Sequence, residues 1–300
     1  MNIEDIKNFS KKINGKCFFN YEIKNLNWFN IGGKTKIFFK PNSLKELLDF
    51  LKLYNKRGKI FILGAGSNVL FSDELYEGVI IKLSSKFNNL SLLDNNTIIA
   101  GSGVLDKSIS DFAQENGIGG FEFLSCIPGT IGGGIRMNSG CFGNEFKDIL
   151  ISVQAIDYHG NIRAIPSKDI NFFYRGSSLE SELIFLSGTF RGQLMDKLKI
   201  KNQVENLKEK KNIAQPTKIK TGGSTFKNPV NQTNKKIWEI IKECVPLDTK
   251  FGDASISSKH CNFFINENKA KSEDMKKLIN YVKKQIKKKT NLIVELEVVI

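Results

Sequence analysis

The chain has 300 residues, of which 40% are hydrophobic, and it carries a formal net charge of +14. This size and apolar content allow two or three subdomains with buried cores. No run approaches the roughly eighteen apolar residues of a membrane span, and the opening "MNIEDIKNFSKK" lacks the apolar core of a signal peptide. We therefore expect a cytoplasmic protein with no membrane partner.

The excess positive charge comes almost entirely from lysine. The densest basic run, 276–289, places Leu278, Ile279, Val282 and Ile286 at helical spacing, so its lysines are expected to form a solvated face. A lysine bias is typical of an AT-rich genome, and it would also suit a phosphorylated small molecule or a nucleic acid. We favour the first explanation over a nucleic-acid surface and expect no nucleic-acid partner.

The five cysteines form no CxxC pair and have no histidine at ligand spacing. Neither a zinc site nor a disulfide framework is therefore indicated. We expect reduced cysteines that serve mostly in packing, and no bound metal.

The first third of the chain is predicted to alternate helices and strands. Residues 42–59 have apolar positions at 44, 47, 48 and 51 behind an Asn/Ser cap, which is typical of a helix. A buried strand at 60–63 and extended chain over 64–83 should follow. A second strand running into glycine is expected at 97–104, and 106–117 is typical of a capped helix that ends at a glycine.

Residues 117–143 contain nine glycines. That number is too high for the interior of a helix or strand, and the stretch is too apolar for a flexible linker. We expect some group to lie close against this backbone.

Residues 153–166 are typical of a hairpin that turns at His159 and Gly160, so we predict His159 to be a turn residue. The next segment, 167–178, is predicted to form a short capped helix that ends in Tyr174 and Arg175. Further along, we expect a polar helix near 196–213, helices near 234–243 and 272–289, and a strand over 291–300.

The stretch "GAGSN" at 64–68 follows the expected strand at 60–63. Glycines allow close approach to the backbone, and such a turn can present amide groups to a phosphate. A dinucleotide fingerprint needs a third glycine and a following helix, whereas Val69 begins an extended segment, and the Walker pattern fails too. Two tight turns without a ligand remain the alternative, which the second glycine loop "IPGTIGG" at 127–133 weakens.

Residues 220–229, "KTGGSTFKNP", have the character of a reactive loop, because a Gly-Gly turn presents Ser224. A nucleophilic serine would need a base such as histidine. The only histidines are His159 and His260, and His260 precedes an apolar stretch that is typical of a strand. We therefore favour a packing or supporting role for His260.

Six motifs in order resemble the UDP-N-acetylenolpyruvoylglucosamine reductases, the MurB family, over about residues 25–300. Each motif is weakly specific, but their combination is highly specific. They are "WFNIGG" (28–33), "LGAGSNVLFSD" (63–73), "FEFLSCIPGTIGGGIRMNSGCFG" (121–143), "FFYRGSS" (172–178), "TGGSTFKNP" (221–229) and "ELEV" (295–298).

The resemblance implies an α+β fold with a PCMH/vanillyl-alcohol-oxidase-type FAD-binding domain and a C-terminal α+β substrate domain. The expected boundaries are 1–25 for an N-terminal helical segment, 26–192 for the FAD-binding domain and 193–300 for the substrate domain. The FAD-binding domain would have lobes at about 26–90 and 91–192. The chain looks like the shorter of the two family types.

The sequence departs from the family pattern at a few positions. Asn27 and Asn30 replace the usual threonine and arginine of the first motif, Cys126 stands where a small residue is common, and Val299 replaces an arginine. These departures put cofactor affinity and local packing in doubt more than the activity.

By resemblance, the reaction is the NADPH-dependent reduction of UDP-N-acetylglucosamine enolpyruvate to UDP-N-acetylmuramate through bound FAD, for peptidoglycan synthesis. Hydride passes from NADPH to FAD and then to the alkene carbon remote from the carboxylate, which builds an enolate-like centre. Ser224 would donate the final proton to carbon as an acid, which removes the need for a histidine. Arg175 and Glu297 would stabilise the developing charge.

The resemblance also assigns binding residues. Tyr174, Lys227 and Asn228 would contact the UDP-sugar. The expected FAD contacts are Gly64, Gly66, Ser67, Asn68, Pro128, Gly129, Thr130 and Gly133.

Other interpretations of these residues stay open. Ser224 could cap its own turn, Arg175 could form a surface ion pair, Glu297 could be an exposed strand carboxylate, and Lys227 could be an ordinary solvated lysine. The whole chain could also be another PCMH-type flavin oxidoreductase acting on an alcohol or sugar acid, or a basic nucleic-acid-binding protein. The sequence does not indicate an oligomeric state.

Overall fold

The computed structural model describes residues 3–55, 58–217 and 219–300. The chain forms two compact units, each built from separate stretches of sequence. The first unit comprises 1–20, 36–65 and 77–210, and the second comprises 21–35, 66–76 and 211–300. The domains expected at 1–25, 26–192 and 193–300 are continuous, and their boundaries remain a prediction.

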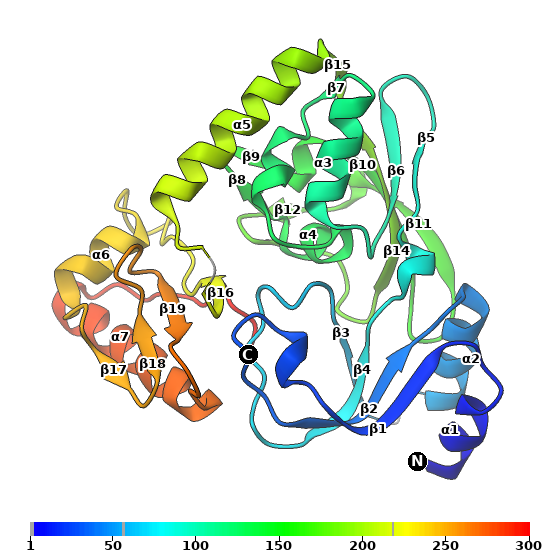
Figure 1. Cartoon of the computed structure of the whole chain (residues 1–300), viewed down its shortest axis with the longest axis horizontal. Coiled ribbons are helices and arrows are strands. Elements are labelled where there is room, and N and C mark those ends of the chain that lie inside the picture. The colour runs from blue at the N-terminus through cyan, green and yellow to red at the C-terminus, as the bar shows by residue number, and fades with distance from the viewer. Residues whose placement is uncertain (1–2, 56–57, 218) are drawn as a thin grey trace. The chain divides into compact units, whose positions relative to one another are not determined.

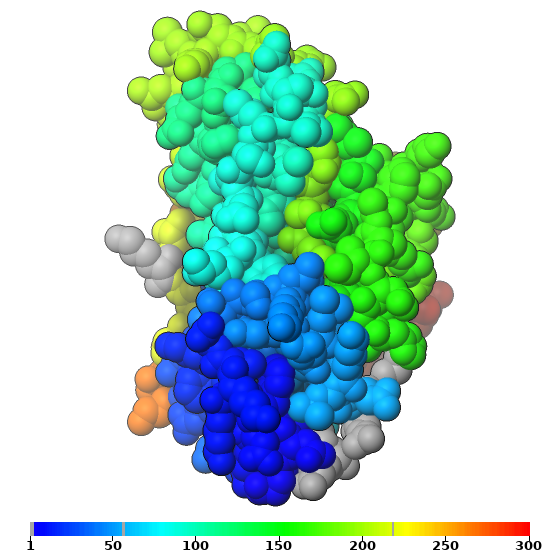
Figure 2. Space-filling view, turned by 90° about the vertical axis from the view of Figure 1, so that its right-hand side faces the viewer, coloured from blue at the N-terminus to red at the C-terminus, as the bar shows by residue number. Residues whose placement is uncertain are grey.

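The first unit begins with a four-stranded sheet of order β1-β2-β4-β3, in which β3 and β4 are parallel. Helix α2 begins after Ser43, whose side chain accepts a hydrogen bond from the Glu46 amide, and it buries Leu47, Phe50 and Leu51. These elements confirm the helix and strand expected over 42–63. Helix α1 packs against α2 and lies at the lower end of Figure 2. The bounds are α1 (Ile3–Ser10), β1 (Lys16–Glu22), β2 (Lys34–Lys40), α2 (Leu44–Tyr54), β3 (Lys59–Ile62) and β4 (Tyr76–Ile81).

A five-stranded antiparallel sheet of order β11-β10-β14-β6-β5 forms the rest of this unit's framework (Figure 1). The hairpin expected at 153–166 is confirmed, because Ile156 pairs with Ile162 and Gly160 in the turn has φ +91°. His159 is exposed in that turn. The strands are β5 (Leu90–Leu92), β6 (Thr97–Gly101), β10 (Leu150–Ile156), β11 (Ile162–Pro166) and β14 (Ile184–Arg191).

Helix α3 (Asp106–Glu115) confirms the helix expected at 106–117, but it begins after Leu105, whose side chain cannot accept a capping hydrogen bond. Two-stranded ladders and short 3-10 turns complete the unit. The ladders are β7 (Ile118–Gly119) with β15 (Gln193–Leu194), β8 (Gly140–Cys141) with β9 (Asn144–Glu145), and β12 (Phe172–Phe173) with β13 (Gly176–Ser177); the turns include η2 (Ser85–Phe87), η3 (Glu122–Cys126), η4 (Phe146–Asp148) and η5 (Ser167–Asp169).

The glycine-rich stretch 117–143 was expected to avoid helix, and this expectation is wrong. Its centre forms helix α4 (Ile131–Met137), which includes Gly132, Gly133 and Gly134. A Cβ on Gly134 would lie 2.2 Å from the buried Phe146 ring, and a Cβ on Gly132 would lie 3.1 Å from Ser102. These two glycines therefore let the helix pack closely against Phe146 and Ser102, which a residue with a side chain would prevent.

The helix predicted over 167–178 is also wrong. Only Ser167–Asp169 forms a 3-10 turn, and the motif that follows is the β12–β13 hairpin. Phe173 pairs with Gly176, so Tyr174 and Arg175 form the two-residue turn between the strands. Arg175 has φ +58°, a left-handed conformation that non-glycine residues rarely adopt.

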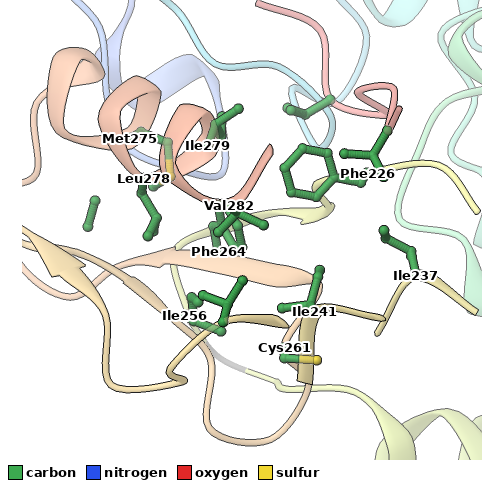
Figure 3. Close-up of a cluster of buried hydrophobic side chains, with 14 of the residues drawn as sticks. Phe226, Ile237, Ile241, Ile256, Cys261, Phe264, Met275, Leu278, Ile279 and Val282 are labelled. Atoms are coloured by element: carbon green, nitrogen blue, oxygen red, sulfur yellow. The ribbon is translucent and has the colours of Figure 1, made fainter. Parts of the chain in front are cut away.

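The second unit contains a sheet of order β16-β19-β18-β17 that shares its core with helices α6 and α7 (Figure 3). The expected inward face of the basic helix is confirmed, because Leu278, Ile279, Val282 and Ile286 are all buried. The bounds are η1 (Lys24–Leu26), β16 (Thr221–Ser224), α6 (Ile237–Cys244), β17 (Lys250–Phe251), β18 (Ala254–Ile256), β19 (Phe263–Asn266) and α7 (Ser272–Thr290). Helix α5 (Lys197–Ala214) confirms the polar helix expected before this unit.

The strand predicted over 291–300 is wrong. These residues form no regular strand and pair through two isolated bridges, Phe226 with Leu296 and Val69 with Val299. We call residues 291–300 the C-terminal tail. Its pairing partners are far apart in sequence, so no local pattern reveals the arrangement.

Gly134→Ala tests the packing explanation for helix α4. Alanine is normally better than glycine in a helix by about 1 kcal/mol, but the added methyl would press on Phe146, whose ring packs against Phe123 and Phe190. We expect overpacking to lower the free energy of unfolding by about 1–3 kcal/mol, as measured by chemical denaturation. Gly133→Ala is the matched control, because its methyl would meet only the Thr130 hydroxyl at 3.6 Å. A Gly134→Ala protein at least as stable as this control would contradict the explanation.

Candidate functional site

Ser224 ends the short strand β16 and pairs with Phe263 of β19. The expected Gly-Gly turn is in fact a bulged strand, because the register shifts between Thr221 and Ser224. Gly223 has φ +77°, and a Cβ on Gly222 would lie 2.3 Å from the Phe29 ring. Within the described residues the Ser224 hydroxyl makes no hydrogen bond, so it does not cap its own loop.

Glu297 lies on the C-terminal tail beside the segment that follows Ser224. The Glu297 amide donates to the carbonyl oxygen of Thr225 at 2.9 Å, and the Lys227 amide donates to the carbonyl oxygen of Glu295 at 2.9 Å. The Glu297 side chain is half-buried. The structure therefore brings together the chain segments of Ser224 and Glu297, two of the three expected catalytic residues.

The first glycine loop, 64–68, leaves its amides unpaired. In the described part of the chain, the backbone N–H groups of residues 64–68 donate no hydrogen bond. Ser67 and Asn68 are half-buried, and Asn68 donates its side-chain amide to the carbonyl oxygen of Glu297 at 3.0 Å. A row of free amides is the arrangement that a phosphate group requires.

The glycines of the two expected FAD loops differ in what surrounds them. A Cβ on Gly66 would lie 2.0 Å from the Leu26 carbonyl oxygen, and one on Gly64 would lie 2.5 Å from Thr130 Oγ1. A Cβ on Gly129 would lie 2.4 Å from Asp106 Oδ2. The backbone itself therefore requires glycine at Gly66, which has φ +71°, whereas a larger residue at Gly64 or Gly129 would need Thr130 or Asp106 to shift.

Gly133 is the exception, because only Thr130 Oγ1 lies near its would-be Cβ, at 3.6 Å. Gly133 and Pro128 are exposed, whereas Thr130 is buried at the start of α4. Gly133 is therefore the position at which a ligand, and not the protein, best explains the missing side chain.

Asp106 lies behind the second glycine loop, and its amide donates to the Gly129 carbonyl oxygen at 3.2 Å. Its side chain is fully buried, and neither carboxylate oxygen has a hydrogen-bond partner among the described residues. Burial raises the pKa of Asp106 well above its usual value. The sequence analysis gave Asp106 no role of its own, so this buried acid was not foreseen.

Arg175 belongs to the first unit, whereas Ser224 and Glu297 belong to the second. The Arg175 guanidinium donates from Nη2 to the Gly140 carbonyl oxygen at 2.9 Å, and its Nη1 lies 3.8 Å from Glu145 Oε1. Its Cζ also lies 4.8 Å from the centre of the Tyr174 ring. The planar guanidinium is thus held by a carbonyl, a carboxylate and an aromatic face, unlike a freely solvated surface arginine.

Asn138 connects these groups, and the sequence analysis missed it. The residue is fully buried, has φ +42° and ends helix α4. Its Nδ2 donates to Glu145 Oε2 at 2.9 Å and to the Phe173 carbonyl oxygen at 3.2 Å. Asparagine is a common left-handed cap, but the helix that Asn138 ends could not be predicted, so the sequence held no usable signal for it.

The expected substrate contacts also have partners inside the protein. Lys227 Nζ lies 3.4 Å from Glu295 Oε2, and Asn228 Oδ1 accepts a hydrogen bond from the Ile237 amide at 3.0 Å. Lys227 is therefore not simply a solvated lysine, and Asn228 supports the start of α6. Both side chains would have to share these contacts with a substrate.

His260 has the surroundings of a packing residue. Its ring contacts Phe263 edge to face with centroids 4.8 Å apart, and its Nδ1 accepts a hydrogen bond from the Asn262 amide at 3.3 Å. Burial lowers the pKa of His260, which favours the neutral ring.

The departures at the first motif have structural roles. Asn27 is buried and donates its side-chain amide to the carbonyl oxygens of Ile23, Lys24 and Ile31, so it closes the turn around itself. Asn30 has φ +55°, a conformation that asparagine tolerates better than most residues.

The described residues contain no cluster of three or more His, Cys, Asp or Glu side chains able to hold a metal ion. No cysteine within this part of the chain forms a disulfide. None of the described helices is long and apolar enough to cross a membrane.

Comparisons with known proteins cover nearly the whole chain. Residues 215–300 match the family described as "UDP-N-acetylenolpyruvoylglucosamine reductase, C-terminal domain", and residues 35–165 match the family described as "FAD binding domain". A UDP-N-acetylenolpyruvoylglucosamine reductase of Pelagibacter ubique is 57% identical over 99% of both chains. One from Rickettsia typhi is 42% identical over 91% of this chain and 92% of its own.

A solved structure agrees with these sequence matches. The crystal structure of the Thermus caldophilus UDP-N-acetylenolpyruvylglucosamine reductase superposes with a TM-score of 0.81 at 25% identity, covering 95% of this chain and 98% of that one. Together with the mixed helices and strands, the matches confirm the α+β fold class, with a PCMH-type FAD-binding domain and a C-terminal substrate domain.

Asp106→Asn should raise stability in a pH-dependent way. In acid the Asp106 carboxyl is protonated in both the folded and the unfolded protein. As pH rises above about 4, Asp106 of the unfolded chain loses its proton first, because burial raises the pKa of Asp106 in the folded protein. Wild-type stability should then fall with pH by up to about 1.4 kcal/mol per pH unit, and asparagine removes this loss. Denaturation curves from about pH 4 to pH 8 should show the variant's advantage growing with pH.

The control is Asp111→Asn on the same helix, where the side chain is 41% exposed and pairs with Lys107. It should show no growing advantage. An equal free-energy difference for Asp106→Asn at both ends of the pH range would contradict a neutral buried carboxyl.

Proposed function

The chain belongs to the UDP-N-acetylenolpyruvoylglucosamine reductase family, and we propose that it reduces UDP-N-acetylglucosamine enolpyruvate to UDP-N-acetylmuramate with NADPH as the hydride donor. The reaction would be a cytoplasmic step of peptidoglycan precursor synthesis, and hence of cell-wall growth and division. The observation that carries the proposal is the pairing of the Glu297 tail with the segment after Ser224, whose hydroxyl has no other partner in the described chain.

The two glycine loops fit the FAD that the domain match indicates. The unpaired amides of 64–68 suit the charged phosphates, and the bare, exposed backbone at Gly133 allows close approach. Ser67, Pro128 and Thr130 complete the proposed contacts. When bound, FAD supplies the chemistry of hydride transfer, from NADPH to the alkene carbon remote from the substrate carboxylate.

Arg175 and Glu297 are proposed to stabilise the charge that this transfer creates on the substrate. Hydride addition pushes the alkene electron pair toward the carboxylate, which gives an enolate-like dianion. The fixed fork of Arg175 can donate two hydrogen bonds to such a group, and a protonated Glu297 can donate one more. A guanidinium that its own contacts already hold, as those of Arg175 do, needs little reorganisation during the reaction.

Ser224 is proposed to complete the reaction as an acid. The enolate carbon takes the hydroxyl proton to form the second new C–H bond, and water returns a proton to the serine oxygen. Because the Ser224 hydroxyl has no hydrogen-bond partner within the described residues, it is free to turn toward a substrate. Tyr174, Lys227 and Asn228 would position the UDP-sugar.

Ser224→Ala separates the two half-reactions. Reduction of the flavin by NADPH needs no carbon acid, so its rate in stopped-flow absorbance should stay close to normal. Reoxidation by the enolpyruvyl substrate should fall by roughly 10²–10⁴-fold, as is typical when a general acid is lost. Ser224→Cys, which keeps a similar shape and a more acidic proton, should recover part of the rate. Equal slowing of both half-reactions would instead assign Ser224 a structural role and make Glu297 the next candidate acid.

Gly133→Val tests the proposed cofactor loop. A Cβ added at Gly133 lies no nearer to a protein atom than 3.6 Å, from Thr130 Oγ1, so we expect the fold to persist while FAD is excluded. We expect a purified protein with native-like circular dichroism and a flavin absorbance near 450 nm reduced by about tenfold or more, since branched atoms would occupy the approach path. Gly134→Ala, whose methyl points at Phe146, is the control and should retain FAD in its folded fraction. A normally yellow Gly133→Val protein would rule out this loop as an FAD contact.

A further inference from the structure

Asn68, at the end of the first glycine loop, is bonded to the C-terminal tail, and residues 66–70 and the tail both belong to the second unit. Its side-chain Nδ2 donates to the Glu297 carbonyl oxygen at 3.0 Å. Its backbone carbonyl accepts from the Val299 amide at 3.1 Å, and the Leu70 amide donates to the Val299 carbonyl oxygen at 2.8 Å. The tail therefore pairs with the loop in parallel around Val69.

Glu297 consequently has both of its backbone polar groups occupied. Its amide donates to Thr225, directly after Ser224, and its carbonyl accepts from Asn68. The two peptide groups that flank Glu297 fix the direction in which its side chain leaves the backbone. Because the tail has no regular strand or helix to hold it, each of these two contacts matters for that direction.

The side chain and the backbone of Asn68 have different roles. Its side-chain amide faces the main chain of Glu297, whereas its backbone N–H is among the unpaired amides of 64–68. The sequence analysis assigned Asn68 to FAD alone. The structure shows that its side chain is already engaged by the tail, so a cofactor contact is left to the backbone.

We infer that Asn68 is a positioning residue, which aims the Glu297 carboxyl by holding its main chain and couples FAD binding at 64–68 to that placement. The inference rests on the proposed function, because it takes Glu297 to act on the substrate. A ligand that orders the loop also orders the tail through the Asn68 side chain and the Val299 ladder. The coupling is reciprocal: the factor by which bound FAD favours the ordered tail is also the factor by which the ordered tail strengthens FAD binding. A variant that loosens the tail should therefore bind FAD more weakly.

The first experiment compares Asn68→Ala with Gln232→Ala, both at saturating FAD. Gln232 is a matched amide, because its side chain makes two hydrogen bonds to the backbone of Ile293, upstream on the same tail. Asn68→Ala should slow substrate-driven flavin reoxidation by about 3- to 10-fold more than it slows flavin reduction by NADPH, the value of one lost hydrogen bond. Gln232→Ala should change neither step by more than about twofold. Normal reoxidation in Asn68→Ala, or equal slowing in both variants, would overturn the inference.

A double-mutant cycle shows whether Asn68 acts through Glu297. In a Glu297→Ala background, Asn68→Ala should have no further effect on reoxidation, because the carboxyl it positions is absent. Additive losses would mean that Asn68 acts on the reaction by another route and would overturn the inference. If Glu297→Ala alone left reoxidation normal, the proposed role of Glu297 would fail instead.

Hydrogen exchange gives a readout that needs no turnover. Adding FAD to the apo-protein should slow exchange of the Glu297 and Val299 amides, which bond to Thr225 and Asn68, by about 3- to 10-fold in the wild type. The FAD-dependent protection of the Glu297 amide should be lost in Asn68→Ala and kept in Gln232→Ala, whereas the Val299 amide, which bonds to the backbone of residue 68, should stay protected in both. FAD-dependent protection of the Glu297 amide that survives in Asn68→Ala would overturn the coupling, even if Glu297 proved essential to the reaction.

Discussion

The candidate site depends on backbone hydrogen bonds between the C-terminal tail and two segments that are far from it in sequence. The bonds from the Glu297 amide to Thr225 and from the Lys227 amide to Glu295 join the tail to the segment after Ser224. The two backbone bonds of Val299 join the tail to residues 68–70. A tail that forms no regular strand gains its order from these bonds, from those between Gln232 and Ile293, and from the buried Val294 and Val298. Without them, the carboxyl of Glu297 would have no defined position relative to Ser224.

Regular elements with a strong periodic pattern could be predicted from the sequence. Helices α2 and α7 and the β10–β11 hairpin follow from apolar spacing, capping residues and a His-Gly turn. Helix α4 could not be predicted, because its glycines are permitted by contacts with Phe146 and Ser102, which lie elsewhere in the chain. The turn at Arg175 was missed because a left-handed arginine has no local sequence signal.

The candidate site was predicted as a set of residues, but not as a set of contacts. The order of the motifs pointed to Ser224, Arg175 and Glu297, and their catalytic roles remain predictions. The sequence could not show that Asn138 holds Glu145 and the Arg175 hairpin together, or that Asn68 holds the tail. Those roles arise from side-chain hydrogen bonds across long sequence separations, which only three-dimensional structure reveals.

The discontinuous second unit has a consequence for protein synthesis. Residues 21–35 and 66–76 emerge from the ribosome early, yet their packing partners lie in 211–300. Phe29, Ile31 and Leu70, which are buried in the finished core, must therefore stay exposed while the whole first unit is translated. Nascent chains of this protein should consequently need a chaperone to cover these apolar side chains during that interval. Premature termination before residue 211 should leave them exposed and the product prone to aggregation.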